Sequence, residues 1–360
     1  MFRARAFASA LVCVAVVLLA VAGCKIDPPA AAGASPASAD PAGTDSASAD
    51  SAGQQPGLGA SRVGALIIEP GAGFSPVYGL INGARHSIDV TMYEFADSTA
   101  EHDLAAAAKR GVKVQVILDK KEKSVNSNAF KYFSSHRVKV VWSWSRFTYT
   151  HQKTLVIDGS KAVIMTANLT SKYYSTSRDF LVVDTGRADV AAITAVFDDD
   201  FAHRAVTPGD GADLVWSPTD SQAQLLALIN GATASLRIYS EEMGDTTVEN
   251  ALIKAAKRGV AVQVCGENED GEYDSAYTKL ARAGVHISYY SSSTGFYIHG
   301  KVVEADYGTG HARMFVGSEN FSRTSLDDNR ELGLIISDPA VLAAMARTFA
   351  ADFRNGHRWP

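Results

Sequence analysis

The chain has few cysteines, no surplus of basic residues and no long apolar run after its first 24 residues, and each shortage excludes a class of protein. Two of its three cysteines, Cys13 and Cys24, lie in those first residues, so Cys265 has no partner for an intramolecular disulfide in the rest of the chain. Cys265 follows the apolar segment VAVQV and is expected to be a buried small hydrophobe. Acidic residues outnumber basic ones by 39 to 34, which argues against avid, non-specific binding to nucleic acid. Without a second bilayer-length run, the chain after residue 24 is expected to be soluble.

The first 24 residues have the composition of an export signal. Arg3 and Arg5 precede an apolar run that ends in the short segment 21–23 and Cys24. The pattern resembles a bacterial lipoprotein signal, in which Cys24 becomes the lipidated first residue; a plain secretory peptide and a short membrane anchor are the alternatives. We therefore expect residues 1–24 to be a signal peptide and the mature protein to be lipid-anchored in the cell envelope, outside the cytoplasm.

Residues 25–61 consist mostly of Ala, Ser, Gly, Pro and Asp and show no hydrophobic periodicity. Such a segment cannot bury a core, so it is expected to be a disordered tether. The folded part is then expected to run from about residue 62 to the end of the chain, which is long enough for one substantial α/β core or two fused ones.

The folded part contains an internal duplication. The segments LINGA and AAKRGV each occur twice, and both pairs are 148 residues apart. A constant offset indicates that one ancestral unit was duplicated, so that two equivalent sites can meet across a pseudo-two-fold axis. We therefore divide the folded part into a first repeat, residues 62–208, and a second repeat, residues 209–360.

Strand-like and helical segments alternate within each repeat. In the first repeat, the β-branched segments 87–95 and 112–119 flank a helical segment that ends in Lys-Arg-Gly. Cations at that end suit the negative pole of the helix dipole, and the glycine allows the helix to stop. The alternation predicts parallel strand pairing with helices on the faces. We expect an α/β fold of two duplicated α/β units, with mixed, largely parallel sheets flanked by helices, packed about a pseudo-two-fold axis.

The pattern His-x-Lys-x-x-x-x-Asp occurs once in each repeat, in register with the duplication. One copy would be weak support for a site, but two copies in register are much stronger. The two copies are His151, Lys153 and Asp158 in the first repeat and His299, Lys301 and Asp306 in the second. The register continues beyond them with an offset of 152 residues, which pairs Asn168 with Asn320, Arg178 with Arg330, and Asp200 with Asp352.

These residue types suit chemistry on a phosphodiester. Lysine ammonium groups and asparagine amides can hold an oxyanion. A neutral imidazole can attack phosphorus while a second, protonated imidazole donates to the leaving oxygen. A dinuclear metal site would require bridging carboxylates, and the acids near the motifs are single ones, so we expect neither a metal nor a cofactor.

The two motifs, together with GSENFS from Gly317 and NRELGL from Asn329, resemble the phospholipase D superfamily, and the resemblance covers essentially the whole folded part. It implies that one of His151 and His299 forms a covalent phosphohistidine. The other histidine would be the general acid and then the base for the incoming water. By analogy with relatives that hold both units in one chain, His151 is assigned as the nucleophile.

The resemblance also implies roles for the other site residues. Asp179 and Glu331 fall where the family places the carboxylate that orients each histidine. Asp158 and Asp306 complete the catalytic motif, although bracing of a strand and turn suits them better than contact with substrate. The residues implied to bind phosphate oxygens are Lys153, Lys301, Asn168 and Asn320.

The first repeat departs from the family pattern. Met165-Thr166 stands where the second repeat has Gly317-Ser318, and the orienting acid is Asp179 rather than Glu. Thr166 can still donate a hydroxyl hydrogen bond, but the loss of glycine puts a close backbone approach to phosphate in doubt on that side. A decayed, structural pseudo-site is the alternative, although packing alone gives no reason to keep polar residues in matched pairs.

Other residues near the motifs have more ordinary explanations. Trp142, Trp144 and Phe147 alternate before the first motif and form either core or an apolar wall that accepts an acyl chain. Tyr149 and Tyr297 each precede a motif histidine by two residues, where strand packing is favoured over contact with substrate. For the matched acids Glu94 and Glu242, and Asp97 and Asp245, turn capping is favoured over catalysis.

Three functions remain open. A phospholipid phosphodiesterase or phosphatidyl transferase at a membrane surface is favoured by the anchor and by the lack of basic excess. The main alternative is an exported nuclease of the same superfamily, and a non-catalytic envelope module is the third. No obligate oligomer is expected, because both half-sites lie in one chain.

Overall fold

The computed structural model describes residues 63–360. The predicted signal peptide 1–24 with its Cys24, the predicted tether 25–61 and the first residue of the predicted first repeat lie outside the described residues. Within the described part, no helix is both long enough and apolar enough to cross a membrane.

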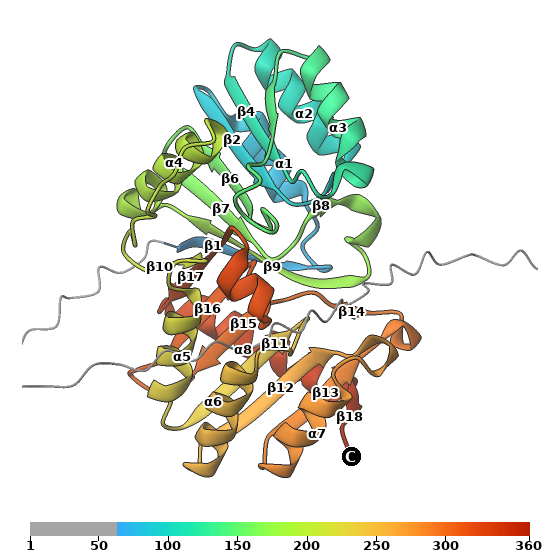
Figure 1. Cartoon of the computed structure of the whole chain (residues 1–360), viewed down its shortest axis with the longest axis vertical. Coiled ribbons are helices and arrows are strands. Elements are labelled where there is room, and N and C mark those ends of the chain that lie inside the picture. The colour runs from blue at the N-terminus through green and yellow to red at the C-terminus, as the bar shows by residue number, and fades with distance from the viewer. Residues whose placement is uncertain (1–62) are drawn as a thin grey trace, which may run out of the picture. The chain divides into compact units, whose positions relative to one another are not determined.

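The described chain consists of two units whose helices and main sheet strands follow one another in the same order (Figure 1). The first unit comprises β1 (Val63–Glu69), α1 (Ser75–Gly83), β2 (Ser87–Met92), β3 (Phe95–Ala96), α2 (Ser98–Lys109), β4 (Lys113–Leu118), α3 (Lys123–Ser135), β5 (Lys139–Trp142), β6 (Lys153–Ile157), β7 (Lys161–Met165), β8 (Leu169–Thr170), β9 (Ser177–Asp184) and α4 (Arg187–Phe201). The second comprises β10 (Leu214–Ser217), α5 (Ser221–Gly231), β11 (Ser235–Ser240), α6 (Thr246–Lys257), β12 (Ala261–Glu267), α7 (Asp274–Arg282), β13 (His286–Tyr290), β14 (Tyr297–Ile298), β15 (Val302–Ala305), β16 (Arg313–Gly317), β17 (Glu331–Ile336), α8 (Pro339–Asn355) and β18 (His357–Arg358).

The two large sheets share one strand order. The first sheet runs β1-β9-β7-β6-β2-β4-β5, and the second runs β10-β17-β16-β15-β11-β12-β13 and adds β18 at its edge. The neighbouring strands β2, β4 and β5 pair in parallel, as do β11, β12 and β13, whereas β1 and β10 each pair antiparallel with their neighbour. The strands that follow the motif histidines join them antiparallel. The predicted α/β class, with duplicated units and mixed sheets flanked by helices, is confirmed.

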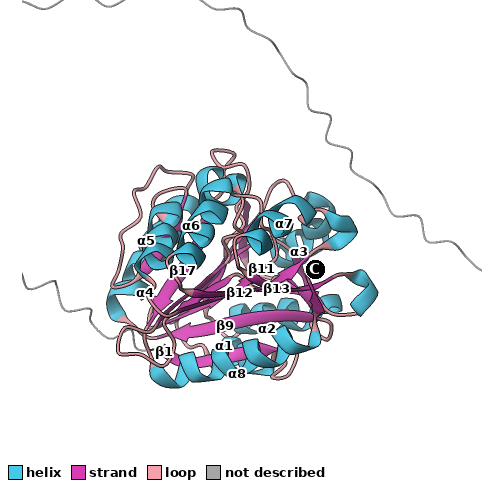
Figure 2. Ribbon diagram, turned by 90° about the horizontal axis from the view of Figure 1, so that it is seen from below, coloured by secondary structure: helices cyan, strands magenta, loops and turns pink. Residues whose placement is uncertain are grey.

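The hydrophobic core has three parts. Helices α1 to α3 cover one face of the first sheet, and α5 to α7 cover one face of the second. The third part lies between the units: residues of both sheets pack there with apolar residues of α4 and α8. Figure 2 shows the helices around the outside of the strands. The described residues therefore belong to one compact body, in which the two units share a core.

The ends of β2 and β11 are fixed in the same way in both units. Asp97 caps α2 by accepting hydrogen bonds from the N–H groups of residues 99 and 100, and Asp245 caps α6 through the N–H groups of residues 247 and 248. The predicted capping role of this acid pair is confirmed. Because each cap fixes the turn that follows its strand, residues 93 and 241 are held at equivalent places.

Candidate active site

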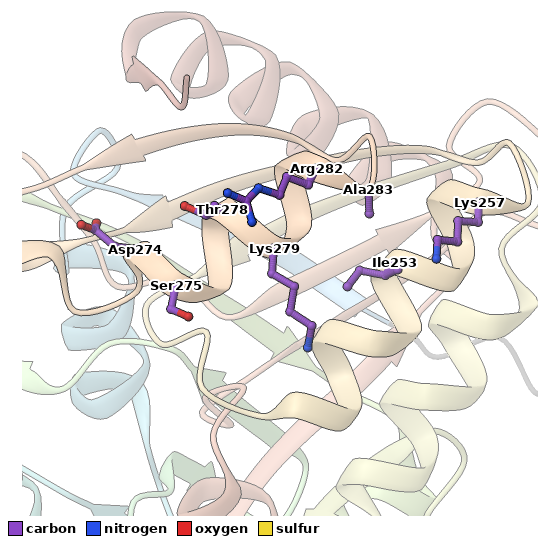
Figure 3. A pocket seen from close by; sticks show the side chains of 8 residues that line it. All are labelled: Ile253, Lys257, Asp274, Ser275, Thr278, Lys279, Arg282 and Ala283. Atoms are coloured by element: carbon purple, nitrogen blue, oxygen red, sulfur yellow. The ribbon is translucent and has the colours of Figure 1, made fainter.

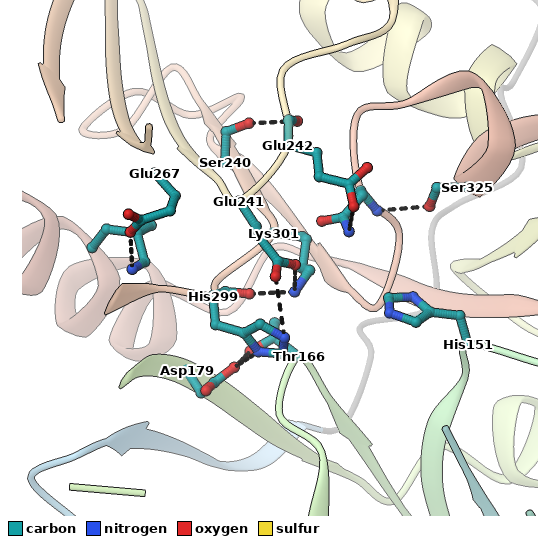
Figure 4. Close-up of polar contacts among 12 residues, drawn as sticks. His151, Thr166, Asp179, Ser240, Glu241, Glu242, Glu267, His299, Lys301 and Ser325 are labelled. Atoms are coloured by element: carbon teal, nitrogen blue, oxygen red, sulfur yellow. Dashed lines mark hydrogen bonds and ion pairs between the residues drawn. The ribbon is translucent and has the colours of Figure 1, made fainter. Parts of the chain in front are cut away.

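Both motif histidines line a single cleft of about 680 Å³. His151 comes from the first unit and His299 from the second, and Asn168 and Asn320 line the same cleft. Figure 4 shows the two imidazole rings on opposite sides of this region. The structure thus brings the two half-sites together.

The segment that carries each histidine is hydrogen-bonded to the other unit. β14 of the second unit pairs in parallel with β9 of the first, and the N–H of His299 donates to the carbonyl of Arg178 over 3.2 Å. In the first unit, the N–H of His151 donates to the carbonyl of Arg330 over 3.0 Å. Each histidine is therefore anchored to the residue that precedes an orienting acid of the other unit.

The imidazole of each histidine is paired with the acid of the opposite unit. His151 Nδ1 lies 2.7 Å from Glu331 Oε2, and His299 Nδ1 lies 2.7 Å from Asp179 Oδ1. A carboxylate at Nδ1 fixes the ring orientation and favours the tautomer whose Nε2 is free to react. The side chains of the two histidines are only 12% and 15% exposed, so this arrangement is largely shielded from water.

The acid of the second unit is itself held by two donors. Glu331 Oε1 accepts hydrogen bonds from Ser325 Oγ at 2.6 Å and from Asn329 Nδ2 at 2.9 Å. Burial raises the pKa of Glu331, but the neighbouring His151 and Lys153 outweigh it and leave the pKa below its ordinary value. Glu331 is therefore a carboxylate aimed at His151.

Thr166 and Ser318 support the acids rather than line the cleft. Thr166 Oγ1 donates to Asp179 Oδ1 at 2.6 Å and accepts from the N–H of Phe180 at 2.9 Å. Ser318 Oγ accepts from the N–H of Leu332, the residue after the other acid, at 3.2 Å. Both side chains are fully buried, so a role in orientation fits them better than contact with phosphate.

The motif lysines are almost completely buried beside the histidines. Lys153 Nζ donates to the carbonyl of His151 at 2.6 Å, and Lys301 Nζ donates to the carbonyl of His299 at 2.5 Å. Burial, reinforced by the neighbouring Lys301, lowers the pKa of Lys153 to about 7. Among the described residues, no carboxylate forms an ion pair with Lys153, whereas Lys301 Nζ lies 2.6 Å from Glu241 Oε2.

The two histidines differ in their electrostatic surroundings. Burial lowers the pKa of His151 to about 4, although Glu331 raises it in part. His151 is therefore neutral near pH 7. His299 lies between two carboxylates, because Glu241 Oε1 is 3.6 Å from its Nε2 while Asp179 contacts its Nδ1. His299 therefore has a carboxylate near each ring nitrogen, whereas His151 has one at Nδ1 alone among the described ion pairs.

The two asparagines present acceptor atoms that have no protein partner. Neither Asn168 Oδ1 nor Asn320 Oδ1 accepts a hydrogen bond within the described part of the chain. Asn320 Nδ2 donates to Glu242 Oε1 at 2.9 Å. Both residues line the cleft, so their amides can reach a bound substrate.

Asp158 and Asp306, placed in the catalytic motif, take part in the fold and not in the lining of the cleft. Asp158 accepts from the backbone N–H groups of residues 85–87, and Asp306 accepts from those of residues 233–235. Despite the opposing effect of partial burial, these bonds hold the pKa of both carboxyls below the ordinary range. The two acids brace the turn that precedes β2 or β11, and their assignment as catalytic residues is corrected to this role.

Glycine occupies position 317 for a different reason from the one that the sequence suggested. A Cβ at Gly317 would lie 2.5 Å from the Cα of Gly333 and 2.3 Å from Glu319 Oε2. The glycines therefore make room for the fully buried side chain of Glu319, whose pKa is raised well above its ordinary value by burial. The first unit fills the equivalent space with Met165, Ala167 and Leu181. The absence of this glycine from the first unit therefore gives no reason to doubt a close backbone approach to phosphate on that side.

The acids Glu94 and Glu242 line the cleft and do not cap a turn, which corrects their predicted role. The cleft also contains residues that sequence reasoning missed, namely Tyr93 and Glu241, with Tyr173, Tyr174 and Phe296. Tyr93 and Glu241 occupy equivalent positions in the two units. The sequence signal that could have identified them was this mismatch between the aligned repeats.

The aromatic residues before the first motif lie elsewhere. Trp142 stacks on Phe130 of α3, with ring centroids 4.3 Å apart, and Phe147 packs against the guanidinium of Arg330. Neither they nor Trp144 contribute to the lining of the cleft among the described residues. They are packing residues and not a wall of the site.

A second cavity, of about 660 Å³, lies between α6 and α7 (Figure 3). It shares no residue with the cleft, and its cations Lys257, Lys279 and Arg282 belong to the last turns of the two helices. Helix-end cations are expected from the helix dipole alone. Among residues 63–360, no group of three or more His, Cys, Asp or Glu side chains is arranged to hold a metal ion.

Comparison with known proteins identifies similar chains. The model of the family described as "Cardiolipin synthase, PLD-like domain" matches residues 77–201 and 225–353, one segment in each unit. No curated protein has significant sequence similarity to the chain.

Two solved structures share the fold over most of the chain. Phosphatidylserine synthase of Haemophilus influenzae Rd KW20 is 11% identical, with a TM-score of 0.63 over 82% of this chain and 87% of that one. Polyphosphate kinase of Porphyromonas gingivalis is 16% identical, with a TM-score of 0.64 over 81% of this chain. The match spans about half, 50%, of the length of that kinase.

Proposed function

The chain belongs to the phospholipase D-like family of phosphodiesterases and phosphotransferases, and on that premise we propose that it is a metal-independent phosphodiesterase that acts on phospholipids through a phosphohistidine. One observation carries the proposal. Two histidines face a single cleft, and each has its Nδ1 paired at 2.7 Å with an acid of the opposite unit. Such a pair supplies one nucleophile and one proton donor for the same phosphorus.

In the first step, His151 Nε2 attacks phosphorus and the bond from phosphorus to the leaving oxygen breaks. The low pKa of His151 keeps its ring neutral and able to attack. The leaving oxygen takes the proton of His299, which has Asp179 at its Nδ1 and Glu241 near its Nε2. Lys153 and Lys301 supply positive charge beside the phosphate, with the amides of the two asparagines as further donors.

In the second step, His299 accepts a proton from water as the water oxygen attacks phosphorus and the bond to His151 Nε2 breaks. Hydrolysis then releases a phosphate monoester. An alcohol in place of water would give a new phosphodiester, so the same residues serve hydrolysis and phosphatidyl transfer.

The lining of the cleft supports a phospholipid over nucleic acid. Three carboxylate side chains, Glu94, Glu241 and Glu242, line it together with several tyrosines. A nucleic-acid groove would instead present a row of cations to neutralise successive phosphates. The matching family and the similar synthase are both named for the synthesis of a phospholipid. An exported nuclease remains the alternative, to be decided by assay.

We further propose that Cys24 carries a lipid that holds the enzyme beside its substrate in the cell envelope, with both half-sites supplied by one chain. Cys24→Ala should move the protein out of the detergent-extracted membrane fraction or leave its signal uncleaved. An unchanged distribution between fractions, with the signal removed, would contradict the anchor.

The assay compares two substrates side by side. The purified full-length chain and its His151→Ala variant are incubated with labelled phospholipid vesicles and with plasmid DNA, in the presence and absence of EDTA. We expect release of a phospholipid product by the wild type in both conditions, none by the variant, and intact DNA. Degraded DNA with intact vesicles would favour the nuclease, and loss of activity in EDTA restored by a divalent ion would contradict the metal-independent mechanism.

A further inference from the structure

The clearest difference between the half-sites is at one pair of equivalent positions. Residue 93 follows β2 and residue 241 follows β11, and the offset of 148 residues relates them. The first is Tyr93 and the second is Glu241, and both line the cleft. The site therefore has an aromatic ring beside one histidine and a carboxylate beside the other.

Glu241 contacts the groups of the second half-site that a phosphate would need. Its Oε2 lies 2.6 Å from Lys301 Nζ, and its Oε1 lies 3.6 Å from His299 Nε2 (Figure 4). Tyr297 donates its hydroxyl to the same Oε1 at 3.0 Å. The carboxylate is only 16% exposed and is thus fixed against the reactive face of the histidine.

Tyr93 makes no such charge contact. Its ring lies edge-on to His151, with centroids 4.5 Å apart, and Lys153 Nζ lies 5.0 Å from its centroid. Its hydroxyl donates to Glu122 at 3.0 Å, away from the lysine. Among the described residues, Lys153 is therefore not paired with a carboxylate, whereas Lys301 is paired with Glu241.

We propose that Glu241 is a specificity-determining residue that makes the cleft discriminate by charge: it tolerates a monoanionic phosphodiester and repels a dianionic phosphate monoester. The inference rests on the proposed function and deepens it, because the monoester is the product of hydrolysis at this site. A fixed carboxylate next to the phosphate position repels each additional negative charge of the ligand.

The charge difference follows from the reaction itself. Water adds to phosphorus, one ester bond breaks, and the alcohol leaves with one of the two water protons. The other proton stays on the new hydroxyl of the phosphate, which ionises with a pKa of about 6. At neutral pH the product therefore carries a second negative charge that the substrate lacks. Glu241 favours its release and limits inhibition by product.

The test measures binding, independently of turnover. Inorganic phosphate at pH 7.5 serves as the dianion and dimethyl phosphate as the monoanion, and calorimetry gives the affinity of each for the full-length wild type and for Glu241→Gln. Glutamine keeps the size of the side chain and an acceptor for Tyr297. We expect the variant to bind inorganic phosphate at least about tenfold more tightly, a change equivalent to ~1.4 kcal/mol. The affinity for dimethyl phosphate should change much less.

Glu242→Gln is the matched control, because Glu242 is the adjacent carboxylate of the same cleft and its Oε1 accepts from Asn320. It should change the affinity for inorganic phosphate by less than Glu241→Gln. Equal effects of the two variants, or an unchanged ratio of dianion to monoanion affinity in Glu241→Gln, would overturn the assignment. If Glu241→Gln does not fold, Glu241→Tyr, which copies the first unit, serves with the same expected and contradicting results.

The two proposals can fail separately. Charge discrimination without phospholipid turnover would refute the proposed substrate and leave the role of Glu241 standing. Phospholipid turnover by a wild type that binds inorganic phosphate as tightly as Glu241→Gln does would refute the role of Glu241 alone.

Discussion

The half-sites around His151 and His299 share a backbone but differ in charge. His151 has one acid partner and the ring of Tyr93 beside it, and burial lowers its pKa to about 4. His299 has an acid at each ring nitrogen, Asp179 at Nδ1 and Glu241 near Nε2. A duplicated scaffold can thus keep the geometry of two sites while their charges differ. In the mechanism that we propose, this difference makes one histidine the nucleophile and the other the acid.

The comparison also shows that neither half-site is complete within its own unit. Each histidine takes its orienting acid from the other unit, and the carbonyl of the residue before that acid accepts a hydrogen bond from the backbone N–H of the histidine. Around the site, Arg178 of the first unit pairs with Asp352 of the second, and Arg330 of the second pairs with Asp200 of the first. The site exists only while the units remain joined.

The largest effect is expected from removal of either histidine. His151→Ala and His299→Ala should each lower kcat on phospholipid by on the order of 10⁴-fold, because each serves a different part of one reaction. The double variant should be no worse than either single one, as measured by initial rates. Full activity in either single variant would contradict a shared site.

Removal of an orienting acid should have a smaller effect. Glu331→Gln and Asp179→Asn should each lower kcat/KM roughly 10- to 100-fold, since the histidine loses the partner that fixes its ring. Asp179→Asn should also impair the proton donor His299. Its loss of kcat/KM should therefore be relieved on a substrate whose leaving group needs no proton, such as p-nitrophenol. Equal losses of both variants on that substrate would show that the two histidines are interchangeable.

The cross-unit ion pairs should determine stability more than activity. Asp352 accepts from Arg178 through both carboxylate oxygens, at 2.7 and 3.0 Å, and also from the hydroxyl of Tyr239 at 2.6 Å. Asp352→Asn should therefore lower the free energy of unfolding by about 3 kcal/mol, the cost of leaving a buried charge without its partner. Asp200→Asn removes fewer hydrogen bonds, so it should lower the free energy of unfolding by less. Denaturant titrations measure both changes. The reverse order would refute this account.

The smallest expected effect is a shift in pH dependence. The rate kcat/KM should rise as His151 loses its proton near pH 4 and fall above about pH 7 as Lys153 loses its own. Lys153→Arg should move the alkaline limb to higher pH, because a guanidinium stays charged, while lowering the overall rate. Lys301→Arg is the matched control and should leave that limb near pH 7. An alkaline limb that moves with Lys301 instead would reverse the assignment.

Much of the fold could be predicted from the sequence, because the constant offsets aligned the repeats and the strand–helix alternation indicated their class. The motif also named the two histidines that meet in the cleft. The crossing of acids and histidines between units could not be predicted, since register relates equivalent residues but does not say which unit a side chain faces. Glu241 was missed because it has no matching residue in the first repeat, and Gly317 was misinterpreted because Gly333, which lies against it in the fold, is distant in the sequence.

In the proposed mechanism, His151 is the nucleophile and His299 is the acid and base. The most direct measurement is mass spectrometry of the full-length His299→Ala chain, quenched during reaction with a p-nitrophenyl phosphodiester. The p-nitrophenol leaving group of this substrate needs no proton donor. Without His299, however, the adduct has no base for its hydrolysis. We therefore predict a burst of p-nitrophenol and a phosphoryl adduct on His151. His151→Ala should give neither. An adduct on His299 in the wild type, or a burst from His151→Ala, would contradict the account.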